Sequence, residues 1–211
     1  MGKTERRVSR DERRQQILDA ATRVFGAKGT SAGTLQEIAE QVGITRAGVL
    51  HHFGSKDMLL QAVLEDRDRS DVAELPDQHV PSGSDWFRHL VRTAVENTQR
   101  PGIVQAYAVL SSEALTEGHQ ATPFFKHRYA ALREEGAQAI EQTWSDAELD
   151  PERVALAAAC IPAVMDGLQI QWLLDPEHVD LARATAFCIE AILNAATPSD
   201  AEPLELPVNP S

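Results

Sequence analysis

The stretch GITRAGVLHHFGSK, residues 43–56, places Arg46, His51, His52 and Lys56 close together and contains no aspartate or glutamate. Arginine and lysine side chains donate hydrogen bonds to phosphate oxygens, and a planar guanidinium can also make a paired contact with guanine. A carboxylate among these residues would repel phosphate. The stretch therefore indicates a surface that faces a polyanion, in a chain whose formal net charge is −12.

Charge is distributed unevenly along the 211 residues of the chain. Residues 1–60 carry a net charge of +3, whereas residues 61–211 carry a net charge of −15. Such asymmetry suggests that the first segment meets an anion and the rest does not. Chance clustering in a soluble protein explains the same pattern, so charge alone does not decide.

Two short helices joined by a tight turn are expected within residues 34–53. Thr34 and Glu37 form a capping-box pattern at the start of the first helix, and Thr45 can cap the second. Gly43 lies between them and permits the positive φ that a tight turn requires. This arrangement predicts a helix-turn-helix.

The second of these helices is expected to enter the major groove of duplex DNA, which is about 12 Å wide. Arg46 can donate two hydrogen bonds to one guanine, and the methyl and hydroxyl of Thr45 can contact a neighbouring base. The helix N-termini at Thr34 and Ser55 offer N–H groups to phosphates, and Lys56 adds a positive charge. Double-stranded operator DNA is the expected partner.

The remaining sequence also favours helices, so the expected fold is all-α with about nine helices. The first helix should begin after Ser9 and end at Gly29, and two later helices should begin at the Asp–Pro pairs 150–151 and 175–176. Pro162 should kink the helix that contains it.

Three parts of the chain are expected. Residues 1–54 form the DNA-binding domain, residues 55–197 form a domain for effector binding and dimerisation, and residues 198–211 form a disordered tail with four prolines. No window approaches the roughly 20 apolar residues that a membrane span needs, so no membrane partner is expected.

An effector site is expected in the larger domain, because polar residues interrupt apolar helix faces there. Its candidate residues are Tyr107, Ser111, Phe125, Tyr129, Met165 and Gln169. A mostly apolar pocket with a few polar anchors is typical of small-molecule sites, which indicates an apolar or amphipathic ligand without strong charge. Ordinary core packing remains an alternative for each of these residues.

A homodimer is expected to form through the last two long helices. Both combine alanine-rich faces with bulky apolar residues, and small residues let helices approach closely. The candidate interface residues are Leu168, Trp172, Phe187, Ile189 and Ile192. A single subunit would leave them as an exposed apolar patch.

Other classes of protein find little support. The enzyme motifs G-x-S-x-G and H-E-x-x-H, the P-loop and the dinucleotide fingerprint are absent, so neither an enzyme nor a cofactor is expected. His51 and His52 point about 100° apart on a helix, which argues against a shared metal ion. Cys160 and Cys188 are expected to be buried in a cytoplasmic protein. A helical protein-binding adaptor and a small all-α enzyme remain as alternatives.

From about Arg14 to Leu64 the chain resembles the TetR family of one-component transcriptional repressors. The resemblance rests on ILDAATRVFGAKG, TLQEIAEQVGITRAGVLHHF and SKDMLL, and a weaker likeness covers DGLQIQWLLDPEHVDL at residues 166–181. It implies an all-α homodimer with an N-terminal DNA-binding domain and a ligand pocket in the C-terminal domain. It further implies that the protein leaves its operator when a small-molecule effector binds.

By position, the resemblance assigns DNA contacts to Thr34, Thr45, Arg46, Ala47, Gly48, Leu50, His51, His52 and Lys56. Leu50 departs from the family, which usually has an aromatic residue there, commonly tyrosine. A phosphate contact through that hydroxyl is therefore not possible in this chain. His51 and His52 are the candidates to replace it.

Overall fold

The computed structural model describes residues 8–72 and 80–197, and these residues form helices joined by turns, without a strand. The nine helices of these residues are α1 (Arg10–Ala32), α2 (Leu35–Val42), α3 (Arg46–Phe53), α4 (Lys56–Val72), α5 (Ser84–Asn97), α6 (Pro101–Glu113), α7 (Thr122–Thr143), α8 (Pro151–Leu174) and α9 (Leu181–Ala196). The all-α prediction is confirmed. The disordered tail predicted for residues 198–211 lies outside the described residues.

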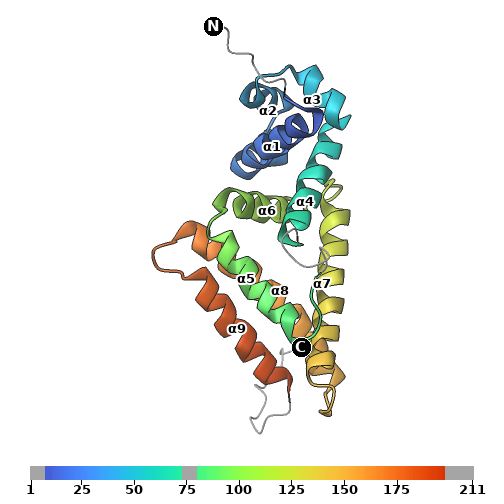
Figure 1. The fold of residues 1–211 in the computed structure, drawn as a ribbon, viewed down its shortest axis with the longest axis vertical. Helices are drawn as coiled ribbons and strands as arrows, with labels where there is room; N and C mark the ends of the chain where they lie inside the picture. The colour runs from blue at the N-terminus through green and yellow to red at the C-terminus, as the bar shows by residue number, and fades with distance from the viewer. Residues whose placement is uncertain (1–7, 73–79, 198–211) are drawn as a thin grey trace, which may run out of the picture.

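The molecule is elongated, with α1, α2 and α3 at one end and α5, α8 and α9 at the other (Figure 1). Helices α4 and α7 run along one side, and α6 packs against α1 and separates the two ends. The apolar core of the first end includes Ile38 and Val49 and continues through Leu59 of α4 to Leu110 of α6. The DNA-binding unit is therefore packed directly onto the larger domain.

The first three helices are capped at the starts that the sequence predicted. Ser9 and Glu12 form a reciprocal capping box at α1, and Thr34 and Glu37 form another at α2. The hydroxyl of Thr45 accepts a hydrogen bond of 3.1 Å from the N–H of Gly48 at the start of α3. These bonds satisfy N–H groups that the first turn of a helix leaves unpaired.

The two turns of this unit depend on glycine. Gly43 has φ 71° and ψ 35°, the left-handed conformation predicted for the turn between α2 and α3. Gly29 has φ 70° and ψ 178° and interrupts α1, which was expected to end there but resumes as far as Ala32. A Cβ atom on Gly29 would also collide with the carboxylate of Glu113 on α6, so glycine is required for this approach.

Helix α9 begins later than predicted. Asp175 does not cap a helix start; its N–H instead donates 2.9 Å to the carbonyl of Gln171 and closes α8. Asp180 is the N-cap of α9 and accepts from the N–H of Arg183 at 3.0 Å. The segment holds two aspartates, and the proline after the first one suggested the wrong start. The similar prediction at Asp150 is confirmed.

Helix α8 runs without interruption from Pro151 to Leu174 and contains Pro162 in its interior. Among the described residues it is the one helix long and apolar enough to cross a membrane by length and composition, contrary to the expectation that no window of the sequence approaches a membrane span. This is weak evidence for a membrane span, because α8 packs against α6, α7 and α9 in this structure. Its apolar character follows from that central position.

Candidate DNA-binding surface and ligand cavity

Helix α3 presents a solvent-facing surface at one end of the molecule. Arg46, Ala47 and His51 are exposed there, while Val49 and Phe53 are buried in the core, and the helix contacts α2 and α4. The alternation follows helical spacing, because buried and exposed residues occupy opposite sides of one short helix. An arginine near the exposed N-terminus of such a helix can reach base edges in a major groove.

Two of the assigned contact residues are less available than the sequence suggested. Leu50 is half-buried and packs against the core of the DNA-binding unit. His52 is also half-buried, and burial together with the charges of His51, Arg10 and Arg13 lowers the pKa of its imidazole. A neutral His52 can still donate one hydrogen bond, but it adds little positive charge.

Basic residues of α1 extend the surface of α3. Arg10 and Arg13 line a shallow hollow together with His51 and His52. Arg13 is held in place by a hydrogen bond of 3.0 Å from its guanidinium to the carbonyl oxygen of Val42. Sequence reasoning omitted both arginines; the signal was the basic run before the first apolar residues of α1.

Lys56 has a structural role that the sequence did not reveal. Its ammonium donates a hydrogen bond to the carbonyl oxygen of Thr30 and lies 5.9 Å from the centre of the Phe25 ring. The side chain therefore ties the start of α4 to the end of α1. A phosphate contact by Lys56 would have to be made in addition to these interactions.

A cluster of polar residues, here named the interdomain joint, connects α1 and α4 to α6 and comprises Thr30, Lys56, Glu113 and His119. The hydroxyl of Thr30 donates to Glu113 at 2.8 Å and lies 2.9 Å from Nε2 of His119. The N–H of Ala121 donates to Nδ1 of His119 at 3.2 Å, which leaves the proton of a neutral ring on Nε2. The ring can therefore donate to Thr30, whose own proton goes to Glu113.

A cavity of about 430 Å³ lies in the larger domain between α4, α5, α6, α7 and α8. Of the predicted effector residues, Tyr107, Tyr129, Met165 and Gln169 line it. Ser111 and Phe125 do not line it: the Ser111 hydroxyl donates to the carbonyl of Ala108, and the Phe125 ring packs 5.0 Å from the Tyr107 ring within the core. The structure brings together four of the predicted residues.

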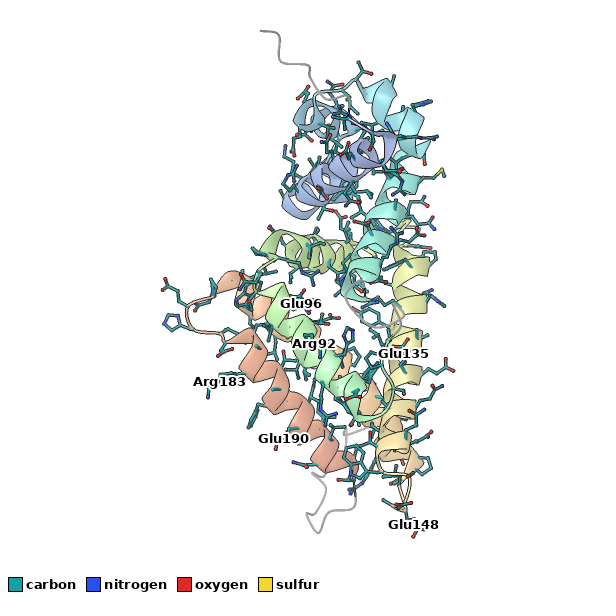
Figure 2. The ribbon with its side chains drawn as sticks, viewed as in Figure 1. Arg92, Glu96, Glu135, Glu148, Arg183 and Glu190 are labelled. Atoms are coloured by element: carbon teal, nitrogen blue, oxygen red, sulfur yellow. The ribbon has the colours of Figure 1, made fainter. Side chains whose placement is uncertain are left out.

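The walls of the cavity combine apolar and charged side chains. The apolar part is formed by Trp86, Leu90, Phe124, Leu132, Ile161, Pro162 and Met165. Glu135, labelled in Figure 2 on α7, accepts a hydrogen bond of 3.4 Å from the indole N–H of Trp86 on α5. The cavity is therefore amphipathic, as the sequence indicated, but more charged than expected.

Sequence reasoning missed the charged residues of the cavity wall. Asp68 of α4 accepts a hydrogen bond of 3.0 Å from Arg67 and forms an ion pair of 2.9 Å with Arg128 of α7. No pattern distinguished these residues from the exposed charges of an amphipathic helix. Asp166 could have been noticed, because it is the one charged residue between Arg153 and Asp175 in an apolar helix.

The ionisable groups of the cavity are perturbed mainly by burial. Burial raises the pKa of Asp166, while the Tyr129 hydroxyl, which donates to its carboxylate, opposes that effect. Burial raises the pKa of Tyr107 to about 12, although Arg128 and Arg67 lie close to its ring. The phenol of Tyr107 is therefore protonated throughout the neutral pH range.

The structure combines a helix-turn-helix, whose second helix is exposed, with a helical body that holds an internal cavity. This combination is typical of DNA-binding regulators that respond to small molecules. Family models agree: "Bacterial regulatory proteins, tetR family" matches residues 17–63, and "BetI-type transcriptional repressor, C-terminal" matches residues 83–196. The chain belongs to the TetR family of transcriptional regulators, and it is not an enzyme.

Individual relatives cover most of the chain. The regulator TtgR of Pseudomonas putida is 32% identical over 184 residues, which span 81% of this chain and 84% of TtgR. BetI of Rhizobium meliloti is 31% identical over 183 residues, 82% of this chain and 84% of BetI. The solved complex of SmeT with triclosan covers 92% of this chain and 99% of the SmeT chain, with a TM-score of 0.73 and 21% identity. SmeT is the repressor of a Stenotrophomonas maltophilia multidrug efflux pump.

Proposed function

We propose that this regulator is a repressor. Helix α3 holds the protein on its operator, and a small molecule bound in the cavity releases it. The observation that carries the proposal is the position of α4. This helix starts at Lys56 beside α3, and its residues Arg67 and Asp68 line the cavity. A ligand that moves α4 would also move the DNA-binding unit. The proposed division is DNA binding by residues 1–54 and effector binding and dimerisation by residues 55–197.

The proposed DNA contacts fall into two groups. Thr45, Arg46, Ala47 and Gly48 lie at the start of α3, where side chains reach base edges. The remaining proposed residues, which would contact phosphates or flank the groove, are Thr34, Leu50, His51, His52 and Lys56. Arg10 and Arg13 add positive charge beside them.

We propose a homodimer formed by the outer faces of α8 and α9. Two predicted interface residues, Trp172 and Ile189, are buried inside the subunit and cannot contribute a large surface. Leu168 and Ile192 are half-buried, and Phe187 is 72% exposed. The sequence suggested the same two helices but not which face of each points outward, because both faces carry apolar residues.

The outward-facing residues of α8 form the better candidate surface. They follow a helical spacing of three and four residues and are exposed, except for the half-buried glycine: Leu156, Cys160, Ala163, Gly167, Ile170 and Leu174. Cys160 is exposed, contrary to the expectation of a buried cysteine, because it lies on this outer face. Small residues in the centre of the stripe would let two copies of α8 approach closely.

The ligand is proposed to be small and amphipathic. A cavity of about 430 Å³ is within the range of drug-sized ligand sites. SmeT, which shares the fold, binds triclosan. Binding to an operator would place this protein in the cytoplasm.

Selection of duplexes from a random DNA library would test the proposal and provide the operator. With the selected duplex, Arg46→Ala should weaken binding by about 1–3 kcal/mol and relax the preference at one base pair in each half-site. Arg133→Ala, at an exposed position of α7, is the matched control and should leave binding unchanged. Unchanged affinity and preference for Arg46→Ala would show that α3 does not read the bases.

A further inference from the structure

Two side chains in the cavity wall carry buried polar atoms with no hydrogen-bond partner among the described residues: the hydroxyl of Tyr107 and Nε of Arg128. Tyr107 is 6% exposed. A buried donor without a partner is costly, and native proteins contain few of them. A pair in the wall of one cavity therefore points to a ligand atom that pairs with them.

Tyr107 is held firmly in this position. The guanidinium carbon of Arg67 lies 4.3 Å from the centre of its ring, and that of Arg128 lies 5.7 Å away. Phe125 packs edge-on against the ring at 5.0 Å. The hydroxyl cannot easily turn to another partner, because charged and aromatic groups fix the ring from several sides.

Both unpaired atoms can act as donors. Nε of a guanidinium carries a hydrogen and has no acceptor capacity. The raised pKa of Tyr107, about 12, keeps its phenol protonated at neutral pH. Their common complement is a hydrogen-bond acceptor, such as a carbonyl oxygen with two lone pairs.

The charge of the surrounding wall favours a neutral acceptor over an anion. Arg67 and Arg128 both bind Asp68, so that carboxylate already neutralises part of their charge. Asp166 of α8 adds a second carboxylate to the cavity wall, and it lies close enough to affect the pKa of Tyr107. A ligand carboxylate would be repelled by both acids, whereas a ketone would not.

We propose that Tyr107 and Arg128 form a donor pair for the carbonyl oxygen of a neutral ligand whose body is aromatic. The body would lie between Trp86, Phe124 and Met165, which line the same cavity. The proposal rests on the proposed function only in that this ligand is the effector. The binding site itself is testable without DNA.

The test compares two probes of nearly identical shape, 2-acetylnaphthalene and 2-isopropenylnaphthalene. The first carries a C=O group where the second carries a C=CH2 group, so they differ in one hydrogen-bond acceptor. Their affinities for the full chain would be measured by calorimetry. We expect the ketone to bind more tightly by about twofold to tenfold for each hydrogen bond made.

Substitutions assign that preference to the donor pair. Tyr107→Phe removes one hydroxyl, so it should weaken the ketone by about twofold to tenfold and leave the affinity for the alkene unchanged. Arg128→Met should also reduce the ratio of the two affinities, and it serves as a second variant if Tyr107→Phe fails to fold. Met165→Leu alters an apolar wall residue and should change both affinities by the same factor.

Equal affinities of the unsubstituted chain for the two probes would overturn the proposal, as would the absence of binding by both. A ratio that survives both Tyr107→Phe and Arg128→Met would overturn it as well. The effect of the ketone on operator binding is measured separately. Tight ketone binding that depends on both donors, but does not release DNA, would support the donor pair and contradict the proposed regulation.

Discussion

Glu113 on α6 accepts hydrogen bonds from both the backbone N–H and the hydroxyl of Thr30, each at 2.8 Å. Thr30 follows the break in α1 at Gly29, so the carboxylate occupies the place where a side chain on that glycine would lie. One residue of the larger domain thereby fixes the end of the first DNA-binding helix. Any motion between the two parts has to disturb this contact or carry it along.

Glu113→Ala should lower the free energy of unfolding by about 1–3 kcal/mol, because two donors lose a charged acceptor. It should also reduce the effect of the effector on operator affinity, since α1 is no longer held to α6. Chemical denaturation and operator titration with and without effector measure the two effects. Glu117→Ala, an exposed acid after α6, is the control. A variant as stable as the control would show that the joint contributes nothing.

Gly48→Ala should stabilise the DNA-binding unit by about 0.5–1 kcal/mol, because glycine is a poor helix residue. A Cβ atom at this position would meet its nearest neighbours, on Ile44 and Thr45, at 3.5 Å, which is an ordinary contact. Operator affinity should fall, since the added methyl group lies on the face proposed to approach DNA. Thermal unfolding should show a more stable protein, whereas operator titration should show weaker DNA binding.

The matched control for this substitution is Gly102→Ala. Gly102 also lies in a helix, and a Cβ atom added there would meet no other atom within 4 Å, but it belongs to α6, away from α3. It should raise stability without changing operator affinity. If Gly48→Ala binds the operator as well as the unsubstituted chain, the start of α3 is not in close contact with DNA.

The helix-turn-helix could be predicted from the sequence because its determinants are local. Capping pairs such as Thr34 with Glu37 lie three residues apart, and Gly43 is required by the turn itself. These capping bonds and this turn form without contacts from residues distant in the sequence. Leu50 was harder to interpret, because its burial depends on packing against other helices.

The cavity could be predicted only in part, for a physical reason. Tyr107 and Gln169 were recognisable as polar residues on apolar faces, which is a local signal. Arg67, Asp68 and Arg128 looked like ordinary solvent-facing charges, and only the tertiary fold, which pairs Asp68 of α4 with Arg128 of α7 at the cavity, turns them inward. The start of α9 was misplaced because two aspartates, at 175 and 180, satisfy the same local rule.

Asp166→Asn should reveal the pH dependence that burial of this carboxyl creates. Burial raises its pKa above the usual value of 3.8, so the folded state binds the proton more tightly than the unfolded state. The stability that Asp166 contributes is therefore complete below about pH 3.8 and is lost as the pH rises through the folded-state pKa. Asparagine is neutral throughout and can still accept a hydrogen bond from Tyr129.

The difference in free energy of unfolding between Asp166→Asn and the unsubstituted chain should grow with pH, by about 1.4 kcal/mol per pH unit between the two pKa values. Denaturation at a series of pH values measures it. Asp146→Asn, at an exposed position, is the control. A difference that stays constant or shrinks as the pH rises would mean that Asp166 is not destabilised by burial.

Phe187→Asp should convert the proposed dimer into monomers. The ring is 72% exposed in the single subunit, and burying it in both copies would contribute about 3–6 kcal/mol. A buried aspartate would also leave an unpaired charge in the interface. Leu115→Asp provides a matched control, because Leu115 is 88% exposed but lies beyond α6, away from α8 and α9. Sedimentation should show monomers for the first variant and dimers for the second.

Operator affinity of Phe187→Asp should fall when the dimer is lost, since two copies of α3 must bind half-sites about 34–36 Å apart. A dimeric Phe187→Asp variant with normal operator affinity would place the interface elsewhere.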